Sequence, residues 1–284
     1  MDLESLWAAL DDGLLPVLRS YRRRLPTLDV AEKADRTLLT EADIAAQDLI
    51  VNIILDAFPH SGFIAEEDDK RLPRLGSPVW VIDPIDGTSE FVNPSAREFC
   101  SVVCRVEDGI PTGAYVLAPE LGVGGNPISI HWAGQVTVNG RGAAPLPARH
   151  MPVQASVTRS KGSSPASHEA ELVRVGCAMK LRTTSQTLDM VRSAIDIGAW
   201  TDGPDQQFDI FYRRSQKVWD GAAGIGLATA MGRVARNARG EDPIPITEEI
   251  LAQAEPTFEA TVSGDRNCVS WFLSLLRTEV SGGG

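Results

Sequence analysis

The chain has 284 residues, enough to bury a sizeable core in one large domain or two moderate ones. Its formal net charge of -11 disfavours nonspecific binding to nucleic-acid polymers or anionic membranes, so a phosphorylated ligand would need metal ions to supply positive charge. No apolar run approaches a membrane span, and the amino terminus lacks the pattern of a secretory signal. We therefore expect a cytoplasmic protein that binds neither a membrane nor a nucleic-acid polymer.

The first part of the chain changes from a helical to a strand-like hydrophobic pattern. Apolar residues at helical spacing predict a helix over residues 3–21, kinked or broken at Pro16, and a second helix over residues 42–58. The predicted strands that follow, the last two of which form a hairpin, cover residues 62–65, 79–82, 100–106 and 112–117.

Proline and glycine are dense over residues 119–152, and we place a domain boundary at the end of this stretch. Residues 1–150 would form an N-terminal α+β domain and residues 151–284 a C-terminal α/β domain. In the second domain predicted strands alternate with predicted helices, which is typical of layered α/β packing. The strands are expected at 154–158, 208–212 and 258–262, and the helices after Ser167, at 185–197, at 220–231 and within 267–280.

The cysteines and histidines suggest neither a zinc site nor a histidine-centred triad. The four cysteines are scattered without zinc-ligand spacing, so buried free thiols are expected. The four histidines are isolated from one another, and each is expected at the surface or in a loop.

The stretch over residues 80–88, Trp-Val-Ile-Asp-Pro-Ile-Asp-Gly-Thr, sets two carboxylates, a carbonyl and a hydroxyl around one tight turn. Asp83 falls at the end of a buried strand, which we expect Pro84 to terminate. Gly87 frees the backbone, and the next residues can start a helix whose amides face the turn. Carboxylates and a main-chain oxygen are ligands that Mg²⁺ prefers, although Asp-Pro and Asp-Gly pairs are also ordinary turn chemistry.

Three further acidic segments each have an adequate structural explanation. The acidic run over residues 66–69 can be a solvated loop, and Asp220 can cap the helix that follows it. Thr40 and Asp43 resemble a capping box with aspartate in place of glutamate. Their order along the chain is more informative than any one of them.

Together these segments resemble the inositol monophosphatase superfamily of Mg²⁺-dependent, lithium-sensitive phosphatases. The resemblance spans residues 3–263 and implies an α/β fold, the layered α-β-α-β-α sandwich of the inositol monophosphatase and fructose-1,6-bisphosphatase type. It also implies a small-molecule phosphate ester as substrate, inhibition by Li⁺, and the homodimer common in the family. The matching motifs are Lys-Ala-Asp at 33–35, Thr-Glu-Ala-Asp at 40–43, Glu-Glu at 66–67, Asp-Pro-Ile-Asp-Gly-Thr at 83–88 and Trp-Asp-Gly-Ala-Ala-Gly at 219–224.

The resemblance implies that oxygen ligands hold two Mg²⁺ ions and a weaker third. Asp83 would be shared by the first two ions, and Asp43 with Glu67 would help to position the third. The first ion would also have Glu67 and the main-chain oxygen of Ile85, and the second would have Asp86 and Asp220.

The family's catalytic roles carry over in the same way. A water activated with help from Glu67 and Thr88 would attack phosphorus in line, without a covalent enzyme intermediate. The amides of Gly87 and Thr88 would bind phosphate oxygens.

Indications of the substrate are mixed. Thr-Arg-Ser at 158–160 is similar to a segment of the bacterial 3'(2'),5'-bisphosphate nucleotidases, so Arg159 and Ser160 are candidate substrate contacts. Arg213 occupies the place of a glutamate in inositol-specific members, and a cation there favours a ligand with a second anionic group. Asp189, also a candidate contact, replaces a lysine of the nucleotide branch and is closer to the inositol branch.

Three functions are therefore compared. The first is a 3'(2'),5'-bisphosphate nucleotidase acting on 3'-phosphoadenosine 5'-phosphate or a related nucleotide. The second is a phosphatase of an inositol, sugar or specialised-metabolite phosphate, and the third is a noncatalytic regulatory protein on the same fold. An extra segment over residues 199–208 either shapes a different substrate pocket or is a surface insertion without a role.

Overall fold

The computed structural model describes residues 1–25, 30–32, 38–67, 72–73, 76–159, 164–203 and 206–281. Within these residues the helices are α1 (Leu3–Arg23), α2 (Glu41–Ala57), α3 (Thr88–Phe91), α4 (Ser167–Arg174), α5 (Gln186–Ala194), α6 (Val218–Ala230), α7 (Glu248–Leu251) and α8 (Arg266–Ser281). None of the helices in the described ranges is long and apolar enough to cross a bilayer.

Two sheets carry most of the strands. The seven-stranded sheet has the order of its sequence and consists of β3 (Gly62–Ala65), β4 (Val79–Asp86), β5 (Cys100–Glu107), β6 (Ile110–Ala118), β7 (Ile128–Ala133), β8 (Gln135–Val138) and β9 (Arg141–Gly142). The five-stranded sheet has the order β12 (Ala178–Lys180), β11 (Gln154–Val157), β14 (Ile210–Arg213), β18 (Thr261–Gly264) and β16 (Val234–Arg236).

Three small two-stranded pairings complete the described strands. They are β1 (Val30–Glu32) with β2 (Leu38–Thr40), β10 (Ala144–Pro145) with β13 (Ile195–Asp196), and β15 (Gln216–Lys217) with β17 (Thr257–Phe258). The strand predicted at 258–262 is therefore two strands, β17 and β18, in different pairings.

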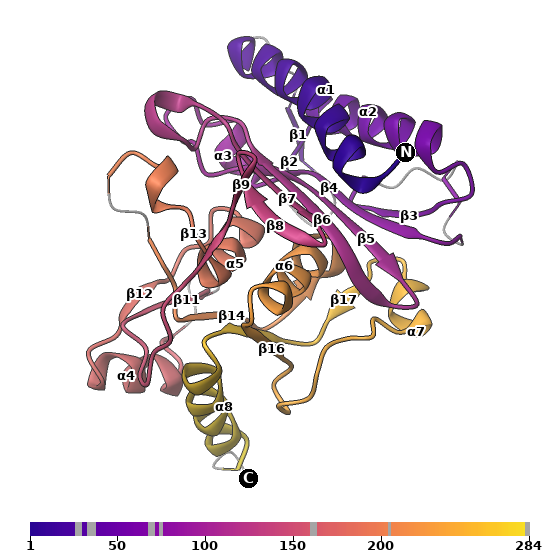
Figure 1. The fold of residues 1–284 in the computed structure, drawn as a ribbon. Helices are drawn as coiled ribbons and strands as arrows, with labels where there is room; N and C mark the ends of the chain where they lie inside the picture. Colours follow the sequence, from indigo (N-terminus) through magenta and orange to yellow (C-terminus); the bar gives the residue numbers. More distant parts are fainter. Residues whose placement is uncertain are drawn as a thin grey trace.

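The elements stack in five layers (Figure 1). Helices α1 and α2 cover the outer face of the seven-stranded sheet, and α5 and α6 fill the space between its inner face and the five-stranded sheet. Helices α4 and α8 cover the far face of the five-stranded sheet. The predicted α-β-α-β-α sandwich is confirmed.

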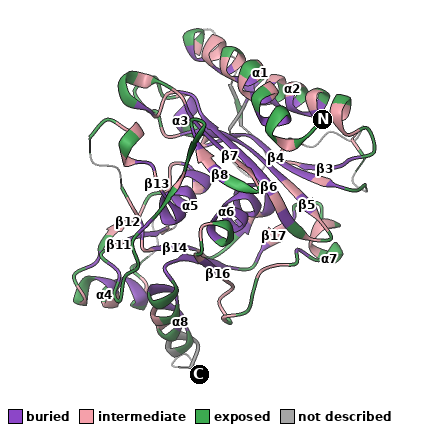
Figure 2. Ribbon diagram, in the orientation of Figure 1, coloured by how far each residue is buried: buried purple, intermediate pink, exposed green. Residues whose placement is uncertain are grey.

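The alternation of side chains along β4 explains how one strand serves two layers. Trp80 and Ile82 belong to the core under α1 and α2, whereas Val81 belongs to the core that α5 and α6 fill. Both faces of β4 are therefore covered, and the strand is almost wholly buried (Figure 2). Helices α5 and α6 from the second half share a core with the first sheet. The predicted division into two domains stays a prediction.

Two expectations concern prolines. Helix α1 is not broken at Pro16, because a stripe of buried leucines holds it on the sheet on both sides of that residue. Strand β4 does not end at Pro84 but continues to Asp86. Its pairing with β5 is irregular between Asp83 and Asp86, which is the kind of place where a strand tolerates a proline.

Other expectations concern the hairpins, thiols and histidines. Asp108 and Gly109 both have positive φ and join β5 to β6 as predicted. All four cysteines are buried and free, also as predicted. The surface or loop location expected for every histidine is wrong for His168, which is buried on α4 and contacts the rings of Tyr212 and Phe272.

Glu98, in the loop between α3 and β5, joins the two halves of the chain. Its carboxylate pairs with Lys180 (3.1 Å) and Arg192 (3.0 Å), and Lys180 also donates to Thr184 and Asp189. Burial by itself would raise the pKa of Glu98, but Arg192, Lys180 and the Thr184 hydroxyl outweigh burial and lower the pKa from 4.5 to about 2.

Replacing Glu98 with glutamine should lower the free energy of unfolding at pH 7 by on the order of 2 kcal/mol, because two cations lose a charged partner. The folded-state pKa is depressed, so the ionised carboxylate stabilises the fold fully above pH 4.5, and the contribution is lost as the pH falls toward 2. Urea unfolding across this range should give stabilities of variant and wild type that converge at low pH.

The matched control is Glu259→Gln, which breaks an exposed pair with Arg239 and should lower the free energy of unfolding much less than Glu98→Gln. Equal losses in the two variants, or a difference that does not change with pH, would contradict this account of Glu98.

Candidate active site

Three aspartates meet where the end of β4 approaches the start of α6. Asp83 and Asp86 lie on β4, and Asp220 lies in the first turn of α6. One carboxylate oxygen of each lies within 4.8 Å of the others, and all three side chains are buried. The structure thus brings together three residues that were expected to act together.

A further carboxylate beside the three aspartates is that of Glu66. Strands β3 and β4 are parallel, and the Glu66 amide donates to the Ile82 carbonyl oxygen (3.0 Å), which places Glu66 beside Asp83. Glu66 lines the cleft and Glu67 does not; the main chain of Glu67 instead bonds to the Gln47 side-chain amide (2.7 and 3.2 Å). The glutamate that the structure places at the cleft is therefore Glu66, whereas the sequence analysis placed Glu67 there.

Burial and mutual repulsion both oppose ionisation of the cluster. Burial has the largest effect on Asp83 and raises its pKa well above the ordinary value, and Glu66, Asp86 and Asp220 raise it further. Burial likewise raises the pKa of Asp220, with added repulsion from Asp86 and Glu66. For Asp86 burial also raises the pKa, against the opposing hydrogen bonds from the start of α5. Buried oxygen donors that repel one another fit a hard divalent cation such as Mg²⁺.

The turn after β4 holds main-chain groups close to the cluster. Gly87 has a φ of 94°, and a Cβ there would lie 2.9 Å from the Thr184 carbonyl oxygen, so glycine is required. The Thr88 hydroxyl donates to the Ile85 carbonyl oxygen (3.2 Å), and the Ile85 amide donates to Asp83 Oδ1 (2.9 Å). Gly87, Thr88 and Ile85 all line the cleft, which is where the sequence placed them.

The residues that donate hydrogen bonds to the Asp86 carboxylate were not predicted from the sequence. The Ser185 hydroxyl and the Thr187 amide each donate to Asp86 Oδ2 at 2.7 Å. Ser185 is the N-cap of α5, and its hydroxyl also accepts from the Leu188 amide (3.1 Å). Ser-Gln-Thr is a favourable helix start, but the sequence does not reveal what that start faces.

Asp43 forms the predicted capping box of α2. Its Oδ2 accepts hydrogen bonds from the amide and hydroxyl of Thr40. Asp43 is buried and is not among the residues that line the cleft, so its catalytic role and its part in a third metal site stay predictions. Ser160 and the motif at 33–35 lie outside the described residues.

Asp189 does not face a substrate site. Its side chain is 0% exposed, accepts from the Ser156 hydroxyl (2.8 Å) and from Lys180 (2.7 Å), and lies near Arg192. The expected substrate contact at Asp189 is therefore wrong for this structure. Its carboxylate is a buried counter-ion of Lys180 instead. Asp189 therefore does not indicate whether the site takes a nucleotide or an inositol phosphate.

A second cleft, with a volume of about 780 Å³, adjoins the carboxylate site. Four arginines line it: Arg159, Arg182, Arg213 and Arg214. Arg182 and Thr183 line both clefts. Arg159 pairs with Glu169 and Arg182 with Glu90, whereas Arg213 and Arg214 have no ion pair in the part of the chain that the structure describes. The expected contacts Arg159 and Arg213 thus share one cleft, which Arg182 joins to the carboxylate site.

In the described part of the extra segment, 199–203 and 206–208, two residues contact the first half of the chain, whereas the Phe208 amide donates to the Arg192 carbonyl oxygen of the second half. Thr201 pairs with Gly122, and the Asp202 carboxylate accepts from the Gly124 amide (2.9 Å). None of these described residues lines the carboxylate cleft or the arginine cleft.

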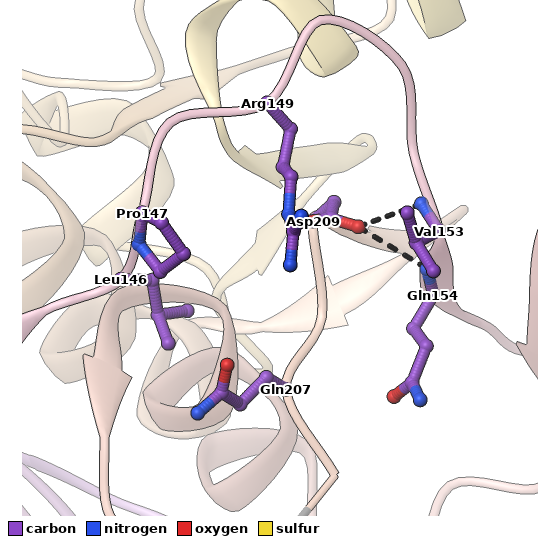
Figure 3. Close-up of a pocket in the computed structure, with 7 residues that line it drawn as sticks. All are labelled: Leu146, Pro147, Arg149, Val153, Gln154, Gln207 and Asp209. Carbon is purple, nitrogen blue, oxygen red and sulfur yellow. Dashed lines mark hydrogen bonds and ion pairs between the residues drawn. The ribbon is translucent and has the colours of Figure 1, made fainter.

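Gln207 of the same segment lines a smaller polar depression of about 130 Å³ (Figure 3). Asp209 Oδ2 accepts there from the amides of Val153 (2.7 Å) and Gln154 (3.1 Å), and Arg149 lies 3.5 Å from Asp209 Oδ1. These bonds tie the start of β11 to the residue before β14. The depression therefore has a structural explanation.

Comparisons with known proteins agree with this site. Residues 5–269 match the inositol monophosphatase family. The chain is 28% identical over 239 residues to the Nus factor SuhB of Xylella fastidiosa, covering 80% of this chain and 78% of that protein. It is 33% identical over 98 residues to the 3'(2'),5'-bisphosphate nucleotidase CysQ of Escherichia coli, covering 34% and 39% respectively.

The fold has a counterpart among solved structures. A staphylococcal inositol monophosphatase-1 in a LiCl-soaked inhibitory complex superposes with a TM-score of 0.76 at 16% identity, covering 97% of this chain and 95% of that one. The family match extends over nearly the whole chain and includes Glu66 and the three clustered aspartates. The chain therefore belongs to the inositol monophosphatase family and is a metal-dependent phosphoric monoester hydrolase.

Proposed function

We propose that the chain hydrolyses a phosphate monoester that carries a second anionic group, with 3'-phosphoadenosine 5'-phosphate or a related 3'(2'),5'-bisphosphate nucleotide as the first candidate. The observation that carries the proposal is the arginine cleft beside the carboxylate cluster. The scissile phosphate would lie at the cluster, and the second anionic group would bind Arg213 and Arg214. The cleft's volume is within the range of ligand sites for small metabolites.

The metal ligands in this proposal are all oxygen donors. Two Mg²⁺ ions would share Asp83, and Li⁺ is expected to inhibit. When bound, the ions supply Lewis-acid catalysis, making a water more acidic and stabilising charge on the leaving oxygen. The remaining ligands would be Glu66, the main-chain oxygen of Ile85, Asp86 and Asp220, with Asp43 near a weaker third ion.

The chain's own groups would then orient the reactants. Glu66, next to Asp83, is the carboxylate that we expect to accept a proton from the attacking water. The Thr88 hydroxyl, already bonded to the Ile85 carbonyl oxygen, would help to orient that water. The amides of Gly87 and Thr88 at the start of α3 would bind phosphate oxygens.

The runner-up is a phosphatase of an inositol, sugar or specialised-metabolite phosphate. Burial of Asp189 removes the main indication for an inositol substrate, and Arg213 stands where a carboxylate would suit a neutral polyol. A noncatalytic regulator is disfavoured because Asp83, Asp86 and Asp220 remain together in the cleft. A cytoplasmic location and a homodimer stay predictions.

Replacing Asp83 with asparagine should lower Mg²⁺-dependent phosphate release by about 10³-fold, because several kcal/mol of metal-derived transition-state stabilisation is lost. The same change removes one of several repelling buried charges, so the metal-free variant should unfold at a higher temperature than metal-free wild type. Asp242→Asn, at an exposed position, is the control. Full activity of Asp83→Asn would refute the metal assignment.

The proposal that Glu66 and not Glu67 is a metal ligand is tested by the pair Glu66→Gln and Glu67→Gln. Glu66→Gln should lower kcat by at least about 10²-fold and weaken metal binding, since a carboxylate at the cluster is lost. Glu67→Gln should stay within about threefold of wild type. Steady-state kinetics over a range of Mg²⁺ concentrations measure both effects, and the reverse order of losses would restore Glu67 as the ligand.

The substrate proposal is tested by Arg213→Glu. It should lower kcat/KM for 3'-phosphoadenosine 5'-phosphate by about 10- to 100-fold, the value of one charge-assisted hydrogen bond, and change kcat/KM for inositol 1-phosphate much less. Arg141→Glu, at an exposed residue of β9, controls for the change in net charge. An unchanged ratio between the two substrates would refute a second anionic group bound at Arg213.

A further inference from the structure

The first turn of α5 contacts two metal-site carboxylates that come from different layers. Ser185 and Thr187 donate to Asp86 Oδ2, and the Gln186 amide is 3.3 Å from Asp86 Oδ1. The Thr187 hydroxyl also donates to the main-chain oxygen of Asp220 (3.1 Å). One short segment therefore fixes the end of β4 relative to the start of α6.

The side chain of Gln186 makes the direct contact with the Asp220 carboxylate. Its Nε2 donates to Asp220 Oδ2, while its Oε1 is buried with no hydrogen-bond partner in the described part of the chain. When Asp220 is ionised, as a metal ligand must be, its oxygens can only accept, and the amide nitrogen of Gln186 is the group that donates to them. A buried amide oxygen without a partner is unfavourable. The placement of the Gln186 side chain is therefore explained by its bond to Asp220 and not by full hydrogen bonding of its own amide.

Close packing of α5 against α6 makes this contact specific. A Cβ at Gly224 of α6 would lie 2.6 Å from the sulfur of Met190 on α5, so the two helices meet at a distance that only glycine permits. Asp220 is one helical turn before Gly224. The position of Asp220 therefore depends on how α6 packs against α5.

We propose that Gln186 is a positioning residue for the metal site: its amide holds one oxygen of Asp220 so that the carboxylate is oriented for a divalent cation before the cation arrives. A neutral donor suits this role, because a lysine or arginine at the same place would neutralise Asp220 and compete with the metal. The inference rests on the metal site of the proposed function and adds a residue that acts through Asp220.

The test is Gln186→Met, which keeps the length of the side chain and removes the donor. Isothermal titration of the substrate-free protein with Mn²⁺ should give a Kd about 10- to 100-fold weaker than that of wild type. In kinetics, activity at low Mg²⁺ should fall while saturating Mg²⁺ restores kcat to near the wild-type value and leaves the substrate KM unchanged. Gln135→Met, at an exposed position on β8, is the matched control.

Thermal unfolding in EDTA shows whether the methionine variant folds. If it does not, Gln186→Ser is used instead: serine is too short to reach Asp220, so this variant should show the same loss of Mn²⁺ affinity. Wild-type Mn²⁺ affinity in the folded variant would overturn the inference while leaving the proposed function intact. A loss of kcat that saturating Mg²⁺ does not restore would also overturn it. Failure of wild type itself to bind Mn²⁺ would overturn both the metal site and this inference.

Discussion

The structure depends on one electrostatic constraint, which is that three aspartates and a nearby glutamate share a buried cleft although their charges repel. Asp83, Asp86 and Asp220 place ligand oxygens within 4.8 Å of one another, and burial raises their pKa values. Such a cluster is unfavourable in a folded protein unless a cation or well-placed donors compensate it. The turn at Gly87 and the start of α5 supply hydrogen-bond donors to these carboxylates. A bound Mg²⁺ would supply the positive charge that offsets their repulsion.

The layered fold supplies these parts from both halves of the chain. Strand β4, covered on both faces, carries two aspartates on a rigid support, and its parallel neighbour β3 leads into Glu66. Helix α6 carries the third aspartate, and α5 lies against α6 and against the turn after β4. The arginine cleft opens next to this centre, so an acidic protein of net charge -11 presents cations where a substrate's second anionic group would lie.

Much of the fold and the reacting centre could be predicted from the sequence, because long periodic helices and a distinctive motif carry local signals. The rest depended on tertiary information. Finding that Glu66 and not Glu67 lines the cleft required the register of β3 against β4, since adjacent residues beyond a strand's end can point to different sides. Asp189 was misassigned because its buried partner Lys180 comes from another element. The contacts of Gln186 likewise join segments that no sequence pattern relates.

The most direct test of the central claim is a crystal structure of the Mn²⁺-loaded protein, with anomalous difference density measured at the manganese edge. The account predicts two peaks about 3.5–4 Å apart, with Asp83 bridging them, Glu66 on one and Asp86 and Asp220 on the other. A cleft without anomalous density at saturating Mn²⁺, or a metal held by Glu67 in place of Glu66, would contradict it.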